Sequence, residues 1–101
     1  MLYRVRLSER ASRDLQGIHS FIAADVSEAA STWFNELADA IYSLERFPGR
    51  GVATPENKKL RHLLFGKKPD TYRIIYATDK RAHVVNVIHI RHAARAKRFV
   101  K

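Results

Sequence analysis

Cysteine is absent from the 101-residue sequence, which excludes disulfide bonds and thiolate metal sites. Long apolar runs are absent too, since no stretch approaches the roughly 18 residues that a membrane-spanning helix needs. The first ten residues also lack the apolar segment of a signal peptide. These absences predict a soluble, cytoplasmic protein with no membrane partner. The length predicts one domain over residues 1–101.

Acidic residues are scarce in the second part of the sequence. Residues 57–101 contain two, Asp70 and Asp79, against thirteen Lys or Arg, whereas residues 1–56 contain eight acids against six Lys or Arg. Like charges at this density repel one another and do not help folding. Such a surface therefore favours binding to nucleic acid or to an acidic protein. The alternative is a basic surface that only keeps the protein soluble.

Two apolar stripes predict two helices. The first follows Ser8, a capping residue, and contains Ala11, Leu15, Ile18 and Ile22 at spacings of 4, 3 and 4.

The second stripe follows another capping residue, Ser27, and ends at Phe47-Pro48-Gly49, because proline cannot continue a helical ladder. We expect two antiparallel helices joined by a short loop. The second stripe consists of Ala30, Trp33, Phe34, Leu37, Ile41 and Leu44.

Strands are predicted where β-branched and aromatic residues gather, in residues 2–7, 60–65, 72–78 and 83–91. Residues 50–59 predict a surface loop. The order is therefore β-α-α-β-β-β. It predicts an α+β fold in which a helical hairpin packs on a small antiparallel sheet.

Basic residues gather on the predicted strands and at their ends. No carboxylate pair of the glycosidase kind lies near them, and Ser and Asp are too sparse around the histidines for a hydrolase triad. The histidine spacing matches no zinc motif, so we expect neither a metal nor another cofactor. The cluster consists of Lys58, Lys59, Arg61, His62, Arg73, His89, Arg91, His92 and Arg95.

Such a cluster suits two kinds of phosphate chemistry. Guanidinium groups bind phosphate in a bidentate manner. Histidines and cations can also cleave RNA without a metal, if one group takes the 2′-hydroxyl proton and another protonates the leaving oxygen.

His92 and Arg95 are the better candidates for this chemistry, because they follow the end of a strand. Arg73 interrupts an apolar strand, which predicts that it faces a partner or an exposed surface. His89 is better explained as a core histidine, and His62 as either a surface or a site residue.

The hairpin register decides which of these side chains share a face. A two-residue loop places Arg73 on the face of His92, and a three-residue loop places it with His89 and Arg91. The sequence leaves both open.

Five segments in order resemble the RelE/ParE superfamily, the toxins of type II toxin–antitoxin pairs. The resemblance covers nearly the whole chain and implies a helical hairpin on a curved antiparallel sheet. The segments are ASRDLQGIHSFIA, AASTWFNELADAIYSLERFPGRG, LRHLLFG, TYRIIYATD and VVNVIHIRHAAR.

The resemblance implies a partner, an antitoxin that wraps the toxin and suppresses it. It also implies a target. RelE-like toxins cut messenger RNA in the ribosomal A site, and this is the function that we expect first. The alternatives are a ParE-like inhibitor of DNA gyrase, which is not an enzyme, and an inactive member that only binds its antitoxin and operator DNA.

RelE-type roles map onto four catalytic candidates by resemblance. Where RelE-like nucleases often have a C-terminal tyrosine, this sequence has Phe99, which stacks on a base but cannot exchange a proton. The catalytic set is Arg61, Arg73, His92 and Arg95, and the RNA- or phosphate-binding set is Lys58, Lys59, Arg91, Lys97 and Arg98.

Overall fold

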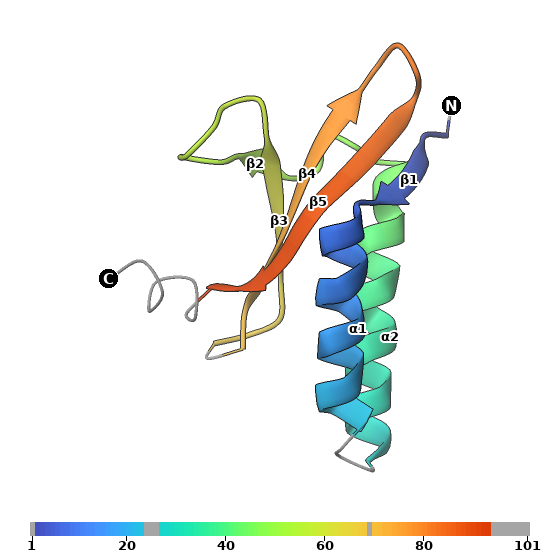
Figure 1. Ribbon diagram of the computed structural model, residues 1–101, viewed down its shortest axis with the longest axis vertical. Helices are drawn as coiled ribbons and strands as arrows, with labels where there is room; N and C mark the ends of the chain where they lie inside the picture. Colours follow the sequence, from blue (N-terminus) through green and yellow to red (C-terminus); the bar gives the residue numbers. More distant parts are fainter. Residues whose placement is uncertain (1, 24–26, 69, 94–101) are drawn as a thin grey trace.

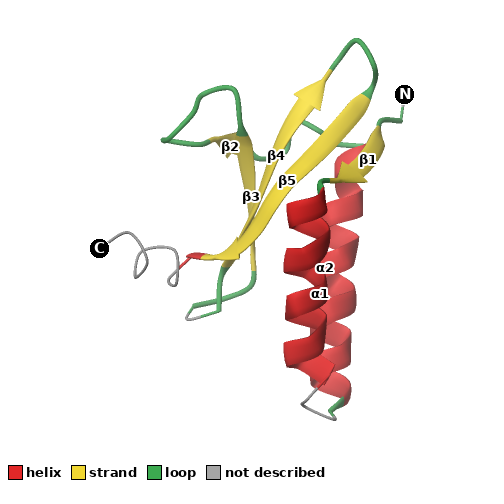
Figure 2. Cartoon of the chain, in the orientation of Figure 1, coloured by secondary structure: helices red, strands yellow, loops and turns green. Residues whose placement is uncertain are grey.

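A computed structural model describes residues 2–23, 27–68 and 70–93 of the chain. Two helices lie side by side on one side of a sheet whose longest strands form a hairpin (Figure 1). Figure 2 shows the same arrangement by type of element. In chain order the elements are β1 (Arg4–Leu7), α1 (Glu9–Ala23), α2 (Glu28–Tyr42), the 3₁₀ turn η1 (Ser43–Glu45), β2 (Val52–Ala53), β3 (Arg61–Phe65), β4 (Tyr72–Asp79) and β5 (Val84–His92).

The α+β class and the predicted order of the helices and long strands are confirmed, but the prediction was wrong at two places. The sheet order is β1-β5-β4-β3-β2, and β1 pairs with β5 in parallel, so the sheet is mixed rather than wholly antiparallel. Parallel pairing is open to β1 because a whole helical hairpin, not a tight turn, follows it. Part of the predicted loop 50–59 forms β2, which pairs with β3 as a two-residue edge strand.

The core lies between the helices and one face of the sheet. Leu37 and Ile41 of α2 are fully buried there, one helical turn apart. Ala11 of α1 is fully buried in the same cluster. From the sheet, Ile74 and Tyr76 of β4 are fully buried as well. We call this covered side the inner face and the opposite side the outer face.

A β-bulge sets the register of the β4–β5 hairpin. Asp79 pairs with Val84, which leaves a four-residue connection that by itself places Arg73 opposite an even-numbered residue. Between the Tyr76–Val87 and Ile75–His89 pairs, however, Ile88 has no partner on β4. The extra residue shifts the register by one, so Arg73 pairs with Arg91.

Ser8 links this bulge to the start of α1. Its Oγ accepts the Ala11 amide at 3.0 Å, the predicted helix cap, and donates to the Ile88 carbonyl at 2.8 Å. Its own amide donates to the Val87 carbonyl at 2.8 Å. One serine therefore stabilises both the helix start and the irregular part of β5.

We expect Ser8→Ala to lower the free energy of unfolding by about 1–2 kcal/mol, the upper half of the range for a lost helix cap. Ser27→Ala is the matched control, because Ser27 Oγ caps α2 at an exposed position through the Ala30 amide alone. Urea unfolding of the two variants measures the difference. Equal losses would mean that the contact with Ile88 contributes nothing.

Candidate functional site

The outer face carries a compact set of mostly polar side chains. Side chains alternate along each strand, and Leu63 of β3, Ile74 of β4 and Ile90 of β5 point toward the core. The residues directly before and after each of them therefore point to the outer face. The register brings these residues together across three strands. They are His62, Leu64, Arg73, Ile75, His89 and Arg91.

Arg73 is the centre of this set. Its Nη1 and Nη2 donate to Glu56 Oε2 and Oε1 at 3.2 and 3.0 Å, a bidentate ion pair. Its Nε donates to His62 Nδ1 at 3.1 Å. The Arg73 side chain is 12% exposed, so these partners compensate for much of its lost hydration.

Glu56 comes from the loop between β2 and β3, which extends away from the helices (Figure 1). The hydrogen bonds from Arg73 lower the pKa of Glu56 from 4.5 to about 2, with help from its own backbone amide and the charge of Arg91. The contribution of this ion pair to stability is therefore present above pH 4.5. It is lost as the pH falls toward 2.

His62 is neutral in this environment. Burial is the main cause that lowers the pKa of His62, and the positive charge of Arg73 lowers it further. Because Nδ1 accepts a hydrogen bond from Arg73, the proton of the neutral ring lies on Nε2. In this state His62 has no free lone pair with which to take a proton from a ligand.

Arg91 lies across from Arg73 and is less well satisfied. Its Nη2 approaches Glu56 Oε2 only to 4.0 Å, beyond hydrogen-bond distance. Its Nε is buried and has no hydrogen-bond partner among the described residues. One carboxylate thus lies near both arginines, but it forms hydrogen bonds only with Arg73 among these two.

His89 is held by α1. Its Nδ1 lies 2.6 Å from Asp14 Oδ2, and the same oxygen accepts the Ile90 amide at 3.0 Å. The ring is therefore paired with α1, but it lies on the outer face and not in the core, where it was predicted.

His92 lies on the other face from Arg73. It pairs with Tyr72, whose ring it meets edge-on with centroids 5.0 Å apart. Its Nε2 lies 3.3 Å from Asp70 Oδ1, and its side chain is 9% exposed. The structure therefore separates two of the predicted catalytic residues.

Arg61 is directed elsewhere as well. It pairs with Tyr76, on the inner side, and its Nη1 donates to the Gly51 carbonyl at 2.7 Å. Lys58 and Lys59 are exposed on the loop that carries Glu56. The other predicted candidates, Arg95, Lys97 and Arg98, lie outside the described residues, as does Phe99.

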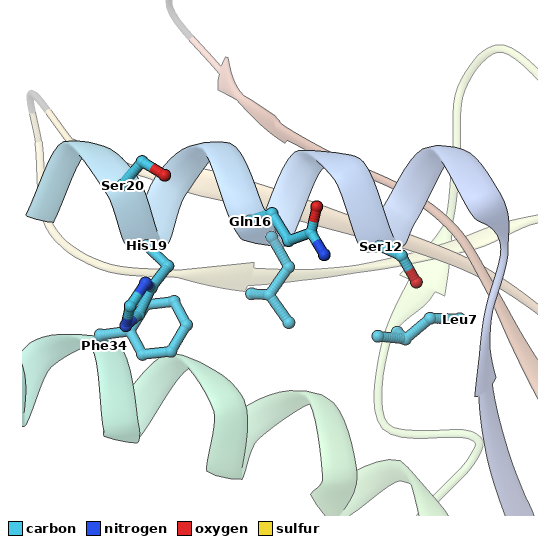
Figure 3. Close-up of a pocket in the computed structure, with 7 residues that line it drawn as sticks. Leu7, Ser12, Gln16, His19, Ser20 and Phe34 are labelled. Carbon is cyan, nitrogen blue, oxygen red and sulfur yellow. The ribbon is translucent and has the colours of Figure 1, made fainter. Parts of the chain in front are cut away.

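A separate hollow of about 480 Å³ lies along the helices and holds no charged pair (Figure 3). His19 and Phe34 meet there between α1 and α2, with ring centroids 4.9 Å apart. The remaining lining residues are Leu7, Ser12, Leu15, Gln16 and Ser20. These side chains supply no constellation for proton transfer.

Within the described ranges, no group of three or more His, Asp or Glu side chains could hold a metal ion. Likewise, no helix found in that part of the chain is long and apolar enough to cross a membrane.

Sequence reasoning missed two carboxylates, Glu56 and Asp14. A signal for Asp14 was present, because it lies three residues after Ala11 and four before Ile18, on the buried stripe of its helix. An acid at such a position needs a partner. For Glu56 the sequence contains only a weak indication of a role, namely that it is the last acidic residue before the acid-poor segment.

The structure therefore shows a helical hairpin on one face of a mixed sheet, with Arg73 and Arg91 beside Glu56 on the uncovered face. A protein-family model described as "ParE toxin of type II toxin-antitoxin system, parDE" matches residues 5–97. The chain therefore belongs to this family of toxins, within the RelE/ParE superfamily.

Solved structures agree with the fold. A chain of the chromosomal ParDE system from P. aeruginosa superposes with a TM-score of 0.68 at 14% identity, over 90% of this chain and 96% of that one. For the RelBE2 toxin–antitoxin complex from Mycobacterium tuberculosis the TM-score is 0.63 at 20% identity, over 93% and 94%. For a free arginine-to-alanine mutant of E. coli RelE it is 0.61 at 16% identity, over 99% and 93%. A search of curated proteins found no match.

Proposed function

We propose that this toxin binds a cognate antitoxin and inhibits DNA gyrase in the cytoplasm, without cleaving RNA. The antitoxin is supported by the family and by similar chains solved as toxin–antitoxin complexes. The choice of gyrase follows the ParE description of the family and the arrangement of the site.

The separation of Arg73 from His92 is the observation that carries this choice. Cleavage of RNA without a metal needs a base and an acid within hydrogen-bond reach of the phosphate that the arginine binds. Arg73 faces outward opposite Arg91, whereas His92 lies inward against Tyr72. The two cannot contact one phosphate in this register.

Cleavage of messenger RNA is the second candidate, and the contact between Arg73 and His62 favours it. If an RNA phosphate drew the Arg73 guanidinium away, Nδ1 of His62 would become free to accept a proton. A lowered pKa keeps His62 in the neutral form that a general base needs.

We expect the purified chain to abolish supercoiling of relaxed plasmid by gyrase at saturating concentration, because the inhibitor blocks the enzyme directly. The chain bound beforehand to its antitoxin is the control and should leave supercoiling unchanged. After induction in cells, thymidine incorporation should fall before methionine incorporation.

Unaffected supercoiling at saturating chain would overturn the gyrase proposal. If methionine incorporation falls first and transcripts are cut, the second candidate replaces it, and His62→Ala should then stop the cutting.

A further inference from the structure

We propose that Arg73 and Arg91 form a site for an acidic side chain of a protein partner, and that Glu56 is an internal competitor that the partner displaces. The proposal concerns how the outer face is occupied, whichever target the toxin acts on. It rests on the proposed function in one respect, because the cognate antitoxin is the partner that we expect to supply the acid.

Glu56 occupies the site as a ligand would. Its two carboxylate oxygens accept from the two terminal nitrogens of Arg73 at 3.0 and 3.2 Å, the fork-to-fork geometry by which arginine recognises a carboxylate. Its side chain is nonetheless 58% exposed, so solvent and other molecules reach it.

Glu56 fills only part of the site. Arg91 Nη2 stays 4.0 Å from the carboxylate, and the buried Arg91 Nε has no hydrogen-bond partner in the described part of the chain. A buried donor without a partner costs free energy that a better placed oxygen would recover. Because two guanidinium groups face one carboxylate, the site favours binding of a second carboxylate. A single carboxylate placed between the two arginines would satisfy both as well.

The loop that carries Glu56 is held by hydrogen bonds of Thr54 and Asn57. Thr54 Oγ1 donates to the Asn57 carbonyl at 2.7 Å and accepts the Asn57 amide at 3.1 Å. Asn57 Oδ1 accepts the Lys59 amide at 2.9 Å, and the Leu60 amide donates to the Asn57 carbonyl at 3.0 Å. Because the loop is stabilised by its own hydrogen bonds, Glu56 can leave Arg73 by rotating its side chain.

Exposed aliphatic side chains beside the arginines favour a protein over a nucleic acid. Leu64 is 57% exposed and is the cross-strand neighbour of Arg73. Val52 is 62% exposed and is the neighbour of His62. A segment with acidic and aliphatic residues complements this mixture, whereas a phosphate backbone would leave the aliphatic groups without contacts.

Glu56 also holds the site at every ordinary pH. Since its pKa is about 2, the carboxylate stays charged and bound to Arg73, and protonation cannot release it. At these pH values a competing anion, and not protonation, displaces Glu56.

The test is a titration of the full chain with a capped Leu-Glu-Glu-Leu tetrapeptide, followed by NMR through the backbone amides of β4 and the Nε–H of Arg73. Glu56→Gln keeps the size of the side chain and removes its charge, so we expect it to bind the peptide on the order of tenfold more tightly than the natural chain. Glu36→Gln is the matched control, because it removes the same charge from an exposed position of α2. It should bind like the natural chain.

Arg73→Gln should abolish binding, and Arg91→Gln should weaken it, which keeps the test decisive if one variant fails to fold. Equal affinities of the natural chain and Glu56→Gln would overturn the role of Glu56. Tighter binding of the dinucleotide UpU than of the peptide would overturn the protein partner in favour of nucleic acid. The titration contains neither gyrase nor ribosome, so its failure is distinct from failure of the proposed function.

Discussion

Replacing Gly51 with alanine is expected to lower the free energy of unfolding by about 3 kcal/mol, the upper end of the usual cost of overpacking. A Cβ at this position would lie 2.6 Å from the His62 carbonyl oxygen and 2.8 Å from the Tyr76 hydroxyl. Gly51 cannot move aside, because its amide donates to that hydroxyl at 2.9 Å and its carbonyl accepts from Arg61. The Tyr76 hydroxyl in turn donates to the Pro48 carbonyl at 2.7 Å.

Gly49→Ala is the matched control, because nothing lies within 4 Å of a Cβ at that position. It should change the free energy of unfolding by less than about 1 kcal/mol in either direction. Urea unfolding at a fixed temperature compares the two variants. A loss for Gly51→Ala as small as that for Gly49→Ala would mean that β3 and Tyr76 relax easily around the added methyl group.

The same contacts connect Gly51 with the candidate site. The carbonyl that the new methyl group would push belongs to His62, whose ring accepts from Arg73. We therefore expect Gly51→Ala to disturb the arginine pair as well as the core. An inactive Gly51 variant would accordingly be a sign of lost folding and not of a catalytic glycine.

Local patterns predicted the helices and long strands well, because each depends on residues near in sequence. The stripe through Leu15 and Ile18 and the caps at Ser8 and Ser27 needed no tertiary information. Strand β2 has only Val52 and Ala53, too few for a periodic signal, and it exists through pairing with β3.

The faces of the sheet could not be predicted in the same way. Whether Arg73 joined His92 or Arg91 depended on Ile88, which bulges where Ser8 contacts it from eighty residues away. One extra residue reverses the face of every side chain beyond it. Even a correct prediction of the length of the β4–β5 turn would have paired Arg73 with the wrong residue.

The cationic surface also changes meaning once the ion pairs are known. Composition shows a segment almost free of acids, yet Glu56, just before it, binds the arginine at its centre. On the inner side, Asp70 lies against His92. On the outer face, Arg91 is therefore the arginine that Glu56 leaves incompletely paired.

Asp14→Ala is expected to lower the free energy of unfolding by about 2–3 kcal/mol, because it removes the acceptor of two groups at once. β1 pairs with β5 only as far as Val87, so beyond the bulge the Ile90 amide faces no strand on that side. Asp14 Oδ2 accepts this amide and also contacts His89 Nδ1, which fixes α1 against β5. Without the carboxylate, a partly buried amide and the histidine ring both lose their partner.

Asp14→Asn separates the shape of this contact from its charge. The amide oxygen of Asn can still accept from the Ile90 amide and from a His89 protonated at Nδ1, so most of the stability should return. Hydrogen exchange at the Ile90 amide reports the contact directly and should quicken strongly in Asp14→Ala but little in Asp14→Asn. Because Arg91 follows Ile90, we expect peptide binding at the arginine pair to weaken in step with this exchange. Unchanged exchange in Asp14→Ala would show that the carboxylate does not protect this amide and that α1 does not hold the second arginine in place.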